Sequence, residues 1–258
     1  MFFNEYQTEE LFFRHAQGKS VRTGKEFHPY HEIFFLLGGN VEFISETHKE
    51  KLPPYTTVII PKKSFHQFII HGDENAYCRC VFNFEKLDGL NALIDRKLSK
   101  ILLVQDDKLT KLFLGCKDGI RAHSSDEERN ALLKAFLSLI LVHINGDTEN
   151  QATPRFHPLT SAAINLINQS SDSPCNATDL AEKLRCSVSY LSHVFKADMQ
   201  IPLYKYILEK KLLYVHDKIQ KGETALNAAL DGGFNDYSGF YRQYKRFFGY
   251  APSNTPRI

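Results

Sequence analysis

The chain has 258 residues, of which 43% are hydrophobic and 24% are charged, so it can bury one large core or two ordinary ones. Its formal net charge is only +2, and its five cysteines fit no zinc-binding spacing, which favours structural thiols over a metal or redox role. The first 18 residues lack the basic start and apolar core of a signal peptide, and no apolar run approaches the ~20 residues of a membrane span. We therefore expect a protein of the reducing cytoplasm with no membrane partner.

The region from about residue 5 to residue 85 is predicted to form β-strands. It contains short runs rich in Phe, Ile and Val that are separated by Gly and Pro turns. Regular spacing of this kind is typical of an antiparallel sandwich or a small barrel. The predicted strands are Glu32–Leu37, Asn40–Ser45, Thr56–Pro61, His66–His71 and Tyr77–Phe84.

Three helices are predicted next, over residues 90–103, 106–120 and 124–144. In the third, Ser125 and Glu128 have the spacing of a capping box, and acidic residues fill the first turn. Residues 131–142 are nearly all apolar, so this helix should be buried on the barrel or against a second subunit.

A polar segment with Gly and Pro, from Asn145 to Pro158, is typical of an interdomain linker. All that follows has helical spacing. Residues 155–258 hold 13 Lys/Arg and 9 Asp/Glu, a basic balance that weakly indicates a polyanionic partner. We expect a sensor and dimerisation domain over 1–148, a linker over 149–158 and a helical domain over 159–258. Its helices should begin near Leu159, Thr178, Ser187, Pro202, Thr224 and Asp236.

The stretch from Leu180 to Gln200 contains two short apolar-periodic runs joined by a tight turn. Ser187 is a good N-cap for the second run. This is the form of a helix-turn-helix, whose second helix enters the DNA major groove. An amphipathic helix in an ordinary bundle would have a similar pattern, so this stretch alone does not distinguish a DNA-binding unit from a helical bundle. The residues expected to face the core are Val188, Leu191, Val194 and Phe195.

A repeat at a spacing of 49 residues favours the DNA-binding interpretation. When the sequence is shifted by this spacing, Ser189–Lys196 aligns with Ser238–Lys245. Both segments have Ser, a large apolar residue, an aromatic residue and Lys at matching positions. Thr224 and Asp236 could cap the two helices of the second unit. With a long helix between them, the two units could place reading helices in successive major grooves about 34 Å apart.

The candidate DNA-binding residues are the polar, aromatic and cationic side chains that this pattern exposes, because short donors suit base edges and cations suit phosphates. Arg242 could bind guanine through two hydrogen bonds or contact a phosphate instead. Lys196 and Lys245 are better placed for phosphate. The full set is Ser187, Ser189, Tyr190, Ser192, His193, Lys196, Asp236, Tyr237, Ser238, Tyr241, Arg242 and Lys245.

Residues 159–257 closely resemble the DNA-binding domain of AraC/XylS-type transcription regulators. The resemblance places His193 and Arg242 at positions that commonly read bases. The second unit carries it in Gly233-Phe234, Asp236, Ser238, Phe240, Tyr244-Lys245, Gly249, Pro252 and Arg257. The first unit carries it in Leu180-Ala181, Ser187, Tyr190-Leu191, Phe195-Lys196 and Tyr206.

The chain departs from that family at four positions. Met199 replaces a Gly, which alters a helix C-cap, and Lys211 replaces an Arg. Val215 replaces Ala and Ala228 replaces Ile, and these two could compensate each other in volume. The second unit is therefore the less typical one.

The strand-rich region contains two phrases close to metal-cupin signatures. Glu26 stands where the first His belongs, and it is followed by His28 and Glu32 at the signature spacing. The second signature ends with a His five residues after a Pro, and Pro61 and His66 keep this spacing. Tyr55 and Lys63 replace the two glycines of that signature. The region resembles a cupin barrel, the usual partner of this DNA-binding domain in sugar regulators.

Two uses of these side chains remain open. Glu26, His28, Glu32 and His66 could form a metal site for Zn, Fe or Mn. The favoured alternative is a metal-free pocket in which these residues bind the hydroxyl groups of an effector. Arg79 is a further effector-binding candidate.

We expect an α+β protein of two domains: an N-terminal cupin-like β-barrel with flanking helices, and a C-terminal all-α domain with two helix-turn-helix units. The favoured function is a transcription regulator, not an enzyme, that binds double-stranded DNA under control of a small molecule. A sugar is one candidate effector, no cofactor or metal is expected, and RNA polymerase is a further candidate partner. A homodimer is expected from the apolar helix and the family resemblance. The alternatives are a metal-dependent cupin enzyme with an accessory helical domain, and a DNA-binding protein whose barrel only dimerises.

Overall fold

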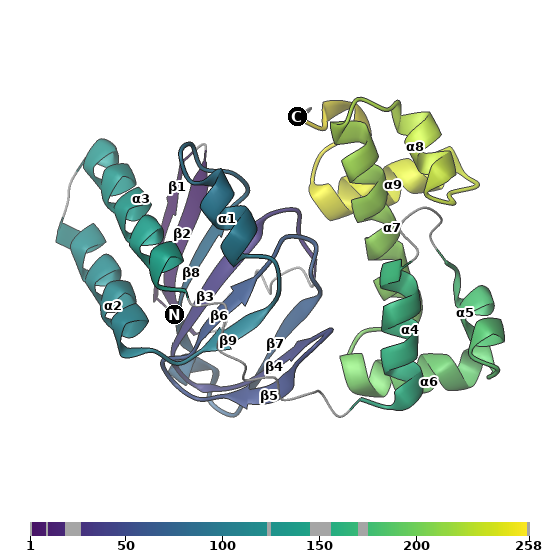
Figure 1. Cartoon of the computed structure of the whole chain (residues 1–258), viewed down its shortest axis with the longest axis horizontal. Coiled ribbons are helices and arrows are strands. Elements are labelled where there is room, and N and C mark those ends of the chain that lie inside the picture. Colours follow the sequence, from purple (N-terminus) through teal and green to yellow (C-terminus); the bar gives the residue numbers. More distant parts are fainter. Residues whose placement is uncertain are drawn as a thin grey trace. The chain divides into compact units, whose positions relative to one another are not determined.

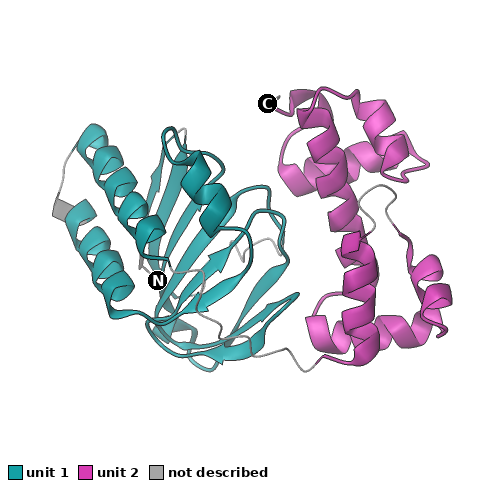
Figure 2. Cartoon of the chain, in the orientation of Figure 1, with its two compact units in different colours: residues 1–154 teal, residues 155–258 magenta. Residues whose placement is uncertain are grey.

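The chain forms two compact units in the computed structural model, residues 1–154 and residues 155–258 (Figure 2). The structure describes residues 2–8, 10–18, 27–122, 125–144, 156–169 and 175–256. Most of the expected linker, residues 149–158, lies outside these ranges. In the described part, no helix is both long and apolar enough to cross a membrane.

The N-terminal unit is built from two antiparallel sheets that lie face to face (Figure 1). The larger sheet has the strand order β1 (Phe2–Gln7), β2 (Leu11–Gln17), β8 (Cys78–Phe84), β3 (His31–Gly38), β6 (Thr57–Ile60) and β9 (Leu102–Val104). The smaller sheet has the order β5 (Lys49–Leu52), β4 (Asn40–Ser45) and β7 (His66–His71). The five predicted strands are confirmed.

The two faces of the larger sheet contact different partners. Phe13, Ile33 and Phe82 point toward the helices and join their core, whereas Phe34 and Val81 join residues of the smaller sheet. Successive residues of a strand alternate between faces, so the inter-sheet face carries the even-numbered residues of β2 and β3 and the odd-numbered residues of β8.

Three helices belong to this unit: α1 (Asn91–Lys97), α2 (Asp107–Ala122) and α3 (Asp126–His143). The predicted helix over 90–103 is wrong in its second half, because Leu102–Val104 pair with β6 as strand β9. A short apolar run cannot be assigned to helix or strand by periodicity alone. Ser125 caps α3 as predicted, its Oγ accepting the Glu128 amide at 3.1 Å.

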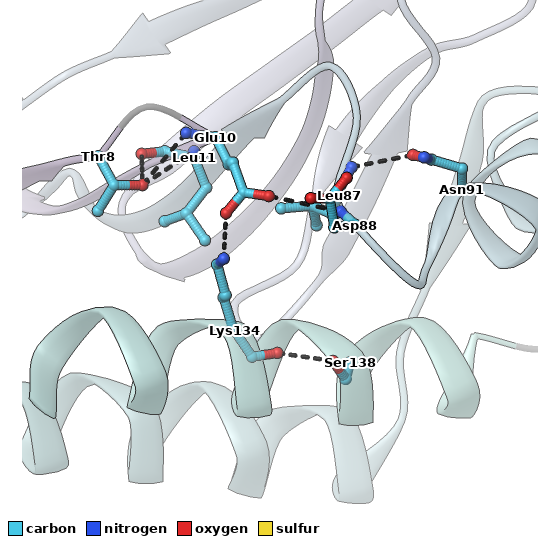
Figure 3. A network of polar contacts seen from close by, with 8 residues as sticks. All are labelled: Thr8, Glu10, Leu11, Leu87, Asp88, Asn91, Lys134 and Ser138. Atoms are coloured by element: carbon cyan, nitrogen blue, oxygen red, sulfur yellow. Dashed lines mark hydrogen bonds and ion pairs between the residues drawn. The ribbon is translucent and has the colours of Figure 1, made fainter. Parts of the chain in front are cut away.

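Helix α3 buries one face within this unit, as expected for packing on the barrel, and burial of its other face against a second subunit stays a prediction. Leu133, Leu137, Ile140 and Leu141 are buried, but Leu139 is 46% exposed and Val142 is 58% exposed. Figure 3 shows how its inner side is attached to the sheet: Lys134 pairs with Glu10 at the β1–β2 turn. That lysine lowers the pKa of the Glu10 carboxyl by hydrogen bonding to it.

The C-terminal unit is entirely helical in its described part. Its helices are α4 (Pro158–Gln169), α5 (Ala177–Lys183), α6 (Val188–Met199), α7 (Leu203–Gln220), α8 (Ala225–Asp231) and α9 (Tyr237–Phe248). The first residue of each of the six helices lies within a residue or two of the predicted position. The predicted caps are confirmed for Ser187, Thr224 and Asp236, whose side chains accept amide protons in the first turn of α6, α8 and α9.

Helix α7 joins two helix pairs of the same form. It packs against α5 and α6 through its first half and against α8 and α9 through its second half (Figure 1). The Phe195 ring of α6 lies 5.2 Å from the Tyr206 ring of α7. Met199 does not itself form the altered C-cap: it is the buried last residue of α6, and Gln200 after it adopts the left-handed conformation, with φ 55°.

Candidate nucleic-acid interface and candidate effector site

Helix α6 separates its buried residues from its predicted DNA-binding residues. Leu191, Val194 and Phe195 are buried as expected, whereas Val188 is 39% exposed, contrary to the expected core position. Val188 lies in the first turn, at the edge of the core stripe. Ser192 is half-buried, and the exposed members of the predicted set are Ser187, Ser189, Tyr190, His193 and Lys196.

Helix α9 repeats this arrangement. Phe240, Tyr244 and Phe247 are buried, and the exposed side chains form one face along the helix. Five of the six predicted residues lie on that face, Tyr237, Ser238, Tyr241, Arg242 and Lys245, and the sixth, Asp236, is the exposed N-cap that precedes the helix. Arg246 is also exposed and adds a cation that the sequence analysis missed.

Two of the predicted residues have structural roles at the helix starts. The Ser187 hydroxyl accepts the Tyr190 amide at 3.2 Å. The Asp236 carboxylate accepts the amides of Ser238 and Gly239 at 3.0 and 2.9 Å. A carboxylate would repel DNA phosphates, but it also stabilises the positive end of the helix dipole, so Asp236 orients α9.

A buried chain of polar groups fixes α9 on α7. The Tyr244 hydroxyl lies 2.6 Å from His216 Nδ1 on α7 and 2.6 Å from the Thr255 hydroxyl beyond α9. Burial raises the pKa of the Tyr244 phenol, so it stays protonated and can donate one hydrogen bond while it accepts the other. The orientation of the second reading helix therefore rests on these bonds as well as on apolar packing.

The entry to the C-terminal unit is attached to the first reading helix. The backbone amide of His157 donates to the Asp198 carboxylate at 2.8 Å. Nε2 of the His157 ring lies 3.4 Å from the hydroxyl oxygen of Tyr190. A predicted DNA-binding side chain thus contacts the point at which the chain enters this unit, which the helix pattern alone did not indicate.

In the N-terminal unit the fold brings together three of the five predicted effector-binding residues. His28 precedes β3, Glu32 lies on β3 and His66 begins β7, and their ligand atoms lie within 4.8 Å of one another. Nε2 of His28 is 3.5 Å and Nε2 of His66 is 3.9 Å from the Glu32 carboxylate. All three side chains are buried.

Backbone carbonyls fix the orientation of both imidazoles. Nδ1 of His28 donates to the carbonyl of Tyr30 at 2.7 Å, and Nδ1 of His66 donates to that of Ser64 at 3.3 Å. In a neutral ring, Nε2 then carries a lone pair rather than a proton. Within the described residues, the buried Nε2 of His28 has no hydrogen-bond partner. The group can therefore accept hydrogen-bond donors or a cation.

The Glu32 carboxylate is held in its ionised form. Burial raises its pKa, but the rings of His28 and His66 in their protonated form, together with the charge of Arg14, outweigh that effect and lower it below the usual value. Asn83 on β8 donates to Glu32 Oε2 at 3.1 Å when its amide nitrogen faces the carboxylate. Sequence reasoning missed Arg14 and Asn83, because only the strand register places them on this face.

The other two predicted residues do not join this cluster. Glu26 lies outside the described residues. Arg79 lies on the inter-sheet face but pairs with Ala16 and Leu36, four residue pairs along the strands from the Asn83–Glu32 pair. It is buried and donates to the carbonyl of Gly18 at 2.8 Å. His28, Glu32 and His66 also suit a divalent transition metal, which imidazole nitrogen and carboxylate oxygen bind well.

The fold and these sites define a helix-turn-helix protein with an N-terminal ligand-binding domain. A family model of the AraC-like ligand binding domain matches residues 9–137, half of the chain, and a model of a helix-turn-helix domain matches residues 180–257. The chain belongs to the AraC family of transcription regulators.

Individual relatives are distant. The chain is 28% identical over 93 residues to the Msm operon regulatory protein of Streptococcus mutans, a match that spans 34% of this chain and only 32% of that relative. Apo ToxT of Vibrio cholerae is 16% identical, with 97% of each chain covered and a TM-score of 0.44. The C-terminal domain of the response regulator yesN of Fusobacterium nucleatum is 28% identical over 36% of this chain and 92% of that one, with a TM-score of 0.33.

Proposed function

We propose that this chain is a cytoplasmic, sequence-specific DNA-binding regulator of transcription whose DNA binding is controlled by a small molecule in the N-terminal unit. The observation that carries the proposal is the repeated exposed face of α6 and α9. Each helix presents serine, aromatic and cationic side chains on the side opposite its buried residues. These are the groups that contact base edges and phosphates in a major groove.

The residues divide into two roles. His193 and Arg242 lie in the middle of the exposed faces and would read bases. Lys196 and Lys245 lie one turn further along and would bind phosphates. Arg242 is the side chain most able to select guanine, through two parallel hydrogen bonds to its major-groove edge.

The effector would bind between the two sheets. His28, Glu32 and His66 supply hydrogen-bonding groups for hydroxyls, as in a sugar. An effector changes DNA binding only if it binds one conformation more tightly than the other, so its affinity must differ between the free and the DNA-bound protein. The protein would act without a metal cofactor or catalytic residues, and activation would also involve contact with RNA polymerase.

A homodimer is part of the proposal. The exposed side of α3 carries an apolar stripe at helical spacing, made of Ala131, Ala135, Leu139 and Val142. A stripe of this kind lies opposite the buried face and could pack against the same stripe of a second copy, as in a two-helix coiled coil.

The test is DNA binding by the full chain to the DNA upstream of its own gene, at several salt concentrations. Arg242→Ala should cost about 1–3 kcal/mol of binding free energy at one base position and relax specificity there. Lys245→Ala should weaken binding on all sequences and lower the salt dependence by about one charge. Lys221→Ala, which removes an exposed cation outside both faces, is the control. Equal binding to all sequences by every variant would refute the proposed readout.

A second candidate function rests on the His28, Glu32 and His66 cluster. These residues could hold a metal ion that would supply Lewis-acid chemistry in a cupin enzyme. Metal analysis of the purified chain separates the two functions. Stoichiometric metal that is lost in His28→Gln and His66→Gln variants would favour the enzyme, and metal-free protein that still binds DNA would favour the regulator. A third candidate, in which the N-terminal unit only dimerises, predicts that no small molecule alters DNA binding.

A further inference from the structure

The inter-sheet face of the larger sheet carries charged side chains in a fixed order. Strand pairing gives three rows across β2, β8 and β3. Glu32 lies in the first row, Arg14 in the second and Arg79 in the third. The full rows are Phe12–Asn83–Glu32, Arg14–Val81–Phe34 and Ala16–Arg79–Leu36. Rows on one face are about 7 Å apart, so Arg79 stands about 14 Å along the sheet from Glu32 at the backbone, and no ion pair joins the two.

Among the described residues, Arg79 is a buried cation that forms no ion pair. Its side chain is 5% exposed and its guanidinium lies 4.2 Å from the centre of the Tyr77 ring. Its one hydrogen bond among the described residues goes to the neutral carbonyl of Gly18. The described carboxylates include none within ion-pair distance of it. An arginine cannot lose its proton in a protein, and a buried charge without a partner is costly, so this environment favours an incoming anion.

Arg14 adds a second cation on the same face. It lies diagonally across the β2–β8 ladder from Arg79, a spacing within reach of long side chains. One side of its guanidinium pairs with Glu5 at 2.5 Å. Its Nε is buried and has no hydrogen-bond partner within the described residues. Like charges this close repel each other unless an anion lies between them.

We propose that Arg79, assisted by Arg14, binds the carboxylate of a small organic acid, so that the effector is an anion. This inference rests on the proposed function and names the ligand class of its sensor unit. The planar guanidinium matches a carboxylate through two parallel hydrogen bonds. The effector's carboxylate would supply the ion-pair partner that Arg79 lacks among the described residues.

The side chains between Arg79 and the His28, Glu32 and His66 cluster are aromatic. Along this face the Tyr77 ring is stacked on the Phe34 ring, with their centres 6.5 Å apart. The Phe34 ring is in turn stacked on that of Phe68 of the smaller sheet, with their centres 4.0 Å apart. His66 follows, with its ring 5.9 Å from that of Phe68. A ligand anchored at Arg79 would therefore pass aromatic faces before it reached the hydrogen-bonding cluster. An acidic sugar and a longer apolar acid both have this chemistry.

The experiment compares acids with their neutral counterparts. Thermal unfolding and calorimetric titration of the full chain would be measured with glucuronate against glucose, octanoate against 1-octanol, and sulfate as a bare anion, each up to 10 mM. The variants are Arg79→Met, which keeps the apolar stem, and Arg79→Lys. Arg96→Met on α1, which removes an exposed arginine of the same unit, is the control.

We expect at least one acid to raise the unfolding temperature of the wild type and of Arg96→Met, while its neutral counterpart does not. Its affinity should fall at least tenfold in Arg79→Met and partly recover in Arg79→Lys. Which acid binds distinguishes an acidic sugar from an apolar acid. The proposal is overturned if the neutral compound binds equally, if the acid binds Arg79→Met equally, or if no anion stabilises the wild type.

The ligand-free variant gives an independent readout. Because Arg79 is held as an unbalanced charge, Arg79→Met without ligand should unfold at the same or a higher temperature than the wild type. A large drop would show that Arg79 serves the fold, and would overturn the proposal. Neither outcome depends on DNA. Loss of all DNA binding by the wild type would refute the proposed regulator while leaving the anion measurements intact.

Discussion

A methyl group of Val215 lies against Gly232: a Cβ added to Gly232 would fall inside van der Waals contact with Val215 Cγ2. Both residues are buried where α7 meets the end of α8. From the sequence we expected Val215 to exchange volume with Ala228. The structure places the backbone of Gly232 directly against Val215, so the position of α8 on α7 depends on a residue without a side chain.

Gly232→Ala should therefore destabilise the C-terminal unit by overpacking, at about 1–3 kcal/mol. Val215→Ala in the same chain should relieve the clash, so the double variant should be more stable than the two separate effects predict. Urea denaturation of the four proteins measures this coupling, which is expected at about 0.5–3 kcal/mol for residues in contact. Simple additivity would contradict the packing described here.

Tyr55 and Lys63 offer a second test, because both non-glycine residues have positive φ angles, 64° and 65°. These are the two positions at which the sequence departs from the glycines of the cupin signature. The left-handed conformation costs a residue with a side chain roughly 1–2 kcal/mol. Glycine avoids this cost, but it loses more conformational entropy on folding, which offsets about half of the gain. Lys63→Gly should thus raise stability by up to about 1 kcal/mol. Lys51→Gly in strand β5 should instead lower it, and a loss in both would contradict the expectation.

Acid should destabilise the N-terminal unit partly through His48. Burial lowers the pKa of this side chain below its usual value, and its Nδ1 lies 2.8 Å from the Thr47 hydroxyl. As the pH falls through the ordinary histidine pKa of about 6.5, the unfolded chain takes up a proton before the folded one does, so stability decreases. Between pH 6.5 and 5, the free energy of unfolding of His48→Gln should decrease less than that of the wild type in denaturation experiments. Identical slopes for the wild type and His48→Gln would exclude His48 as a contributor.

The proposed homodimer predicts that charge on the exposed stripe of α3 separates the subunits. Leu139→Lys combined with Val142→Lys should convert the dimer to a monomer in sedimentation experiments, with little change in unfolding temperature, because both side chains are about half exposed. Leu226→Lys, which changes a leucine of similar exposure on α8, should leave the dimer intact. A variant that stays dimeric would place the interface elsewhere.

Local signals explain why the helical unit was predictable. Ser187, Thr224 and Asp236 satisfy amides within three residues of themselves, so their role can be read from short stretches. Strand β9 was missed because its residues pair with residues of β6 that lie 43 to 47 positions earlier, and nothing near Leu102 indicates that pairing. The same limit applies to the candidate effector site. His28, Glu32 and His66 were found by their spacing, but the separation of Arg79 from them, and the presence of Arg14 beside it, follow only from strand register.

Helix α7 has a further consequence for any DNA site that the protein reads. With 18 residues and a rise of 1.5 Å per residue, it is a rigid rod about 27 Å long that holds one reading helix near each end. Inserting a single residue into it would turn the second reading helix by about 100° relative to the first, whereas adding one base pair between the half-sites turns the DNA by only about a third of that angle. Three added base pairs would match that angle, but they would separate the half-sites by about 10 Å, whereas the inserted residue lengthens α7 by only about 1.5 Å. No change in operator spacing could therefore match both the rotation and the rise, so the length of α7 fixes where the second reading helix can meet the DNA.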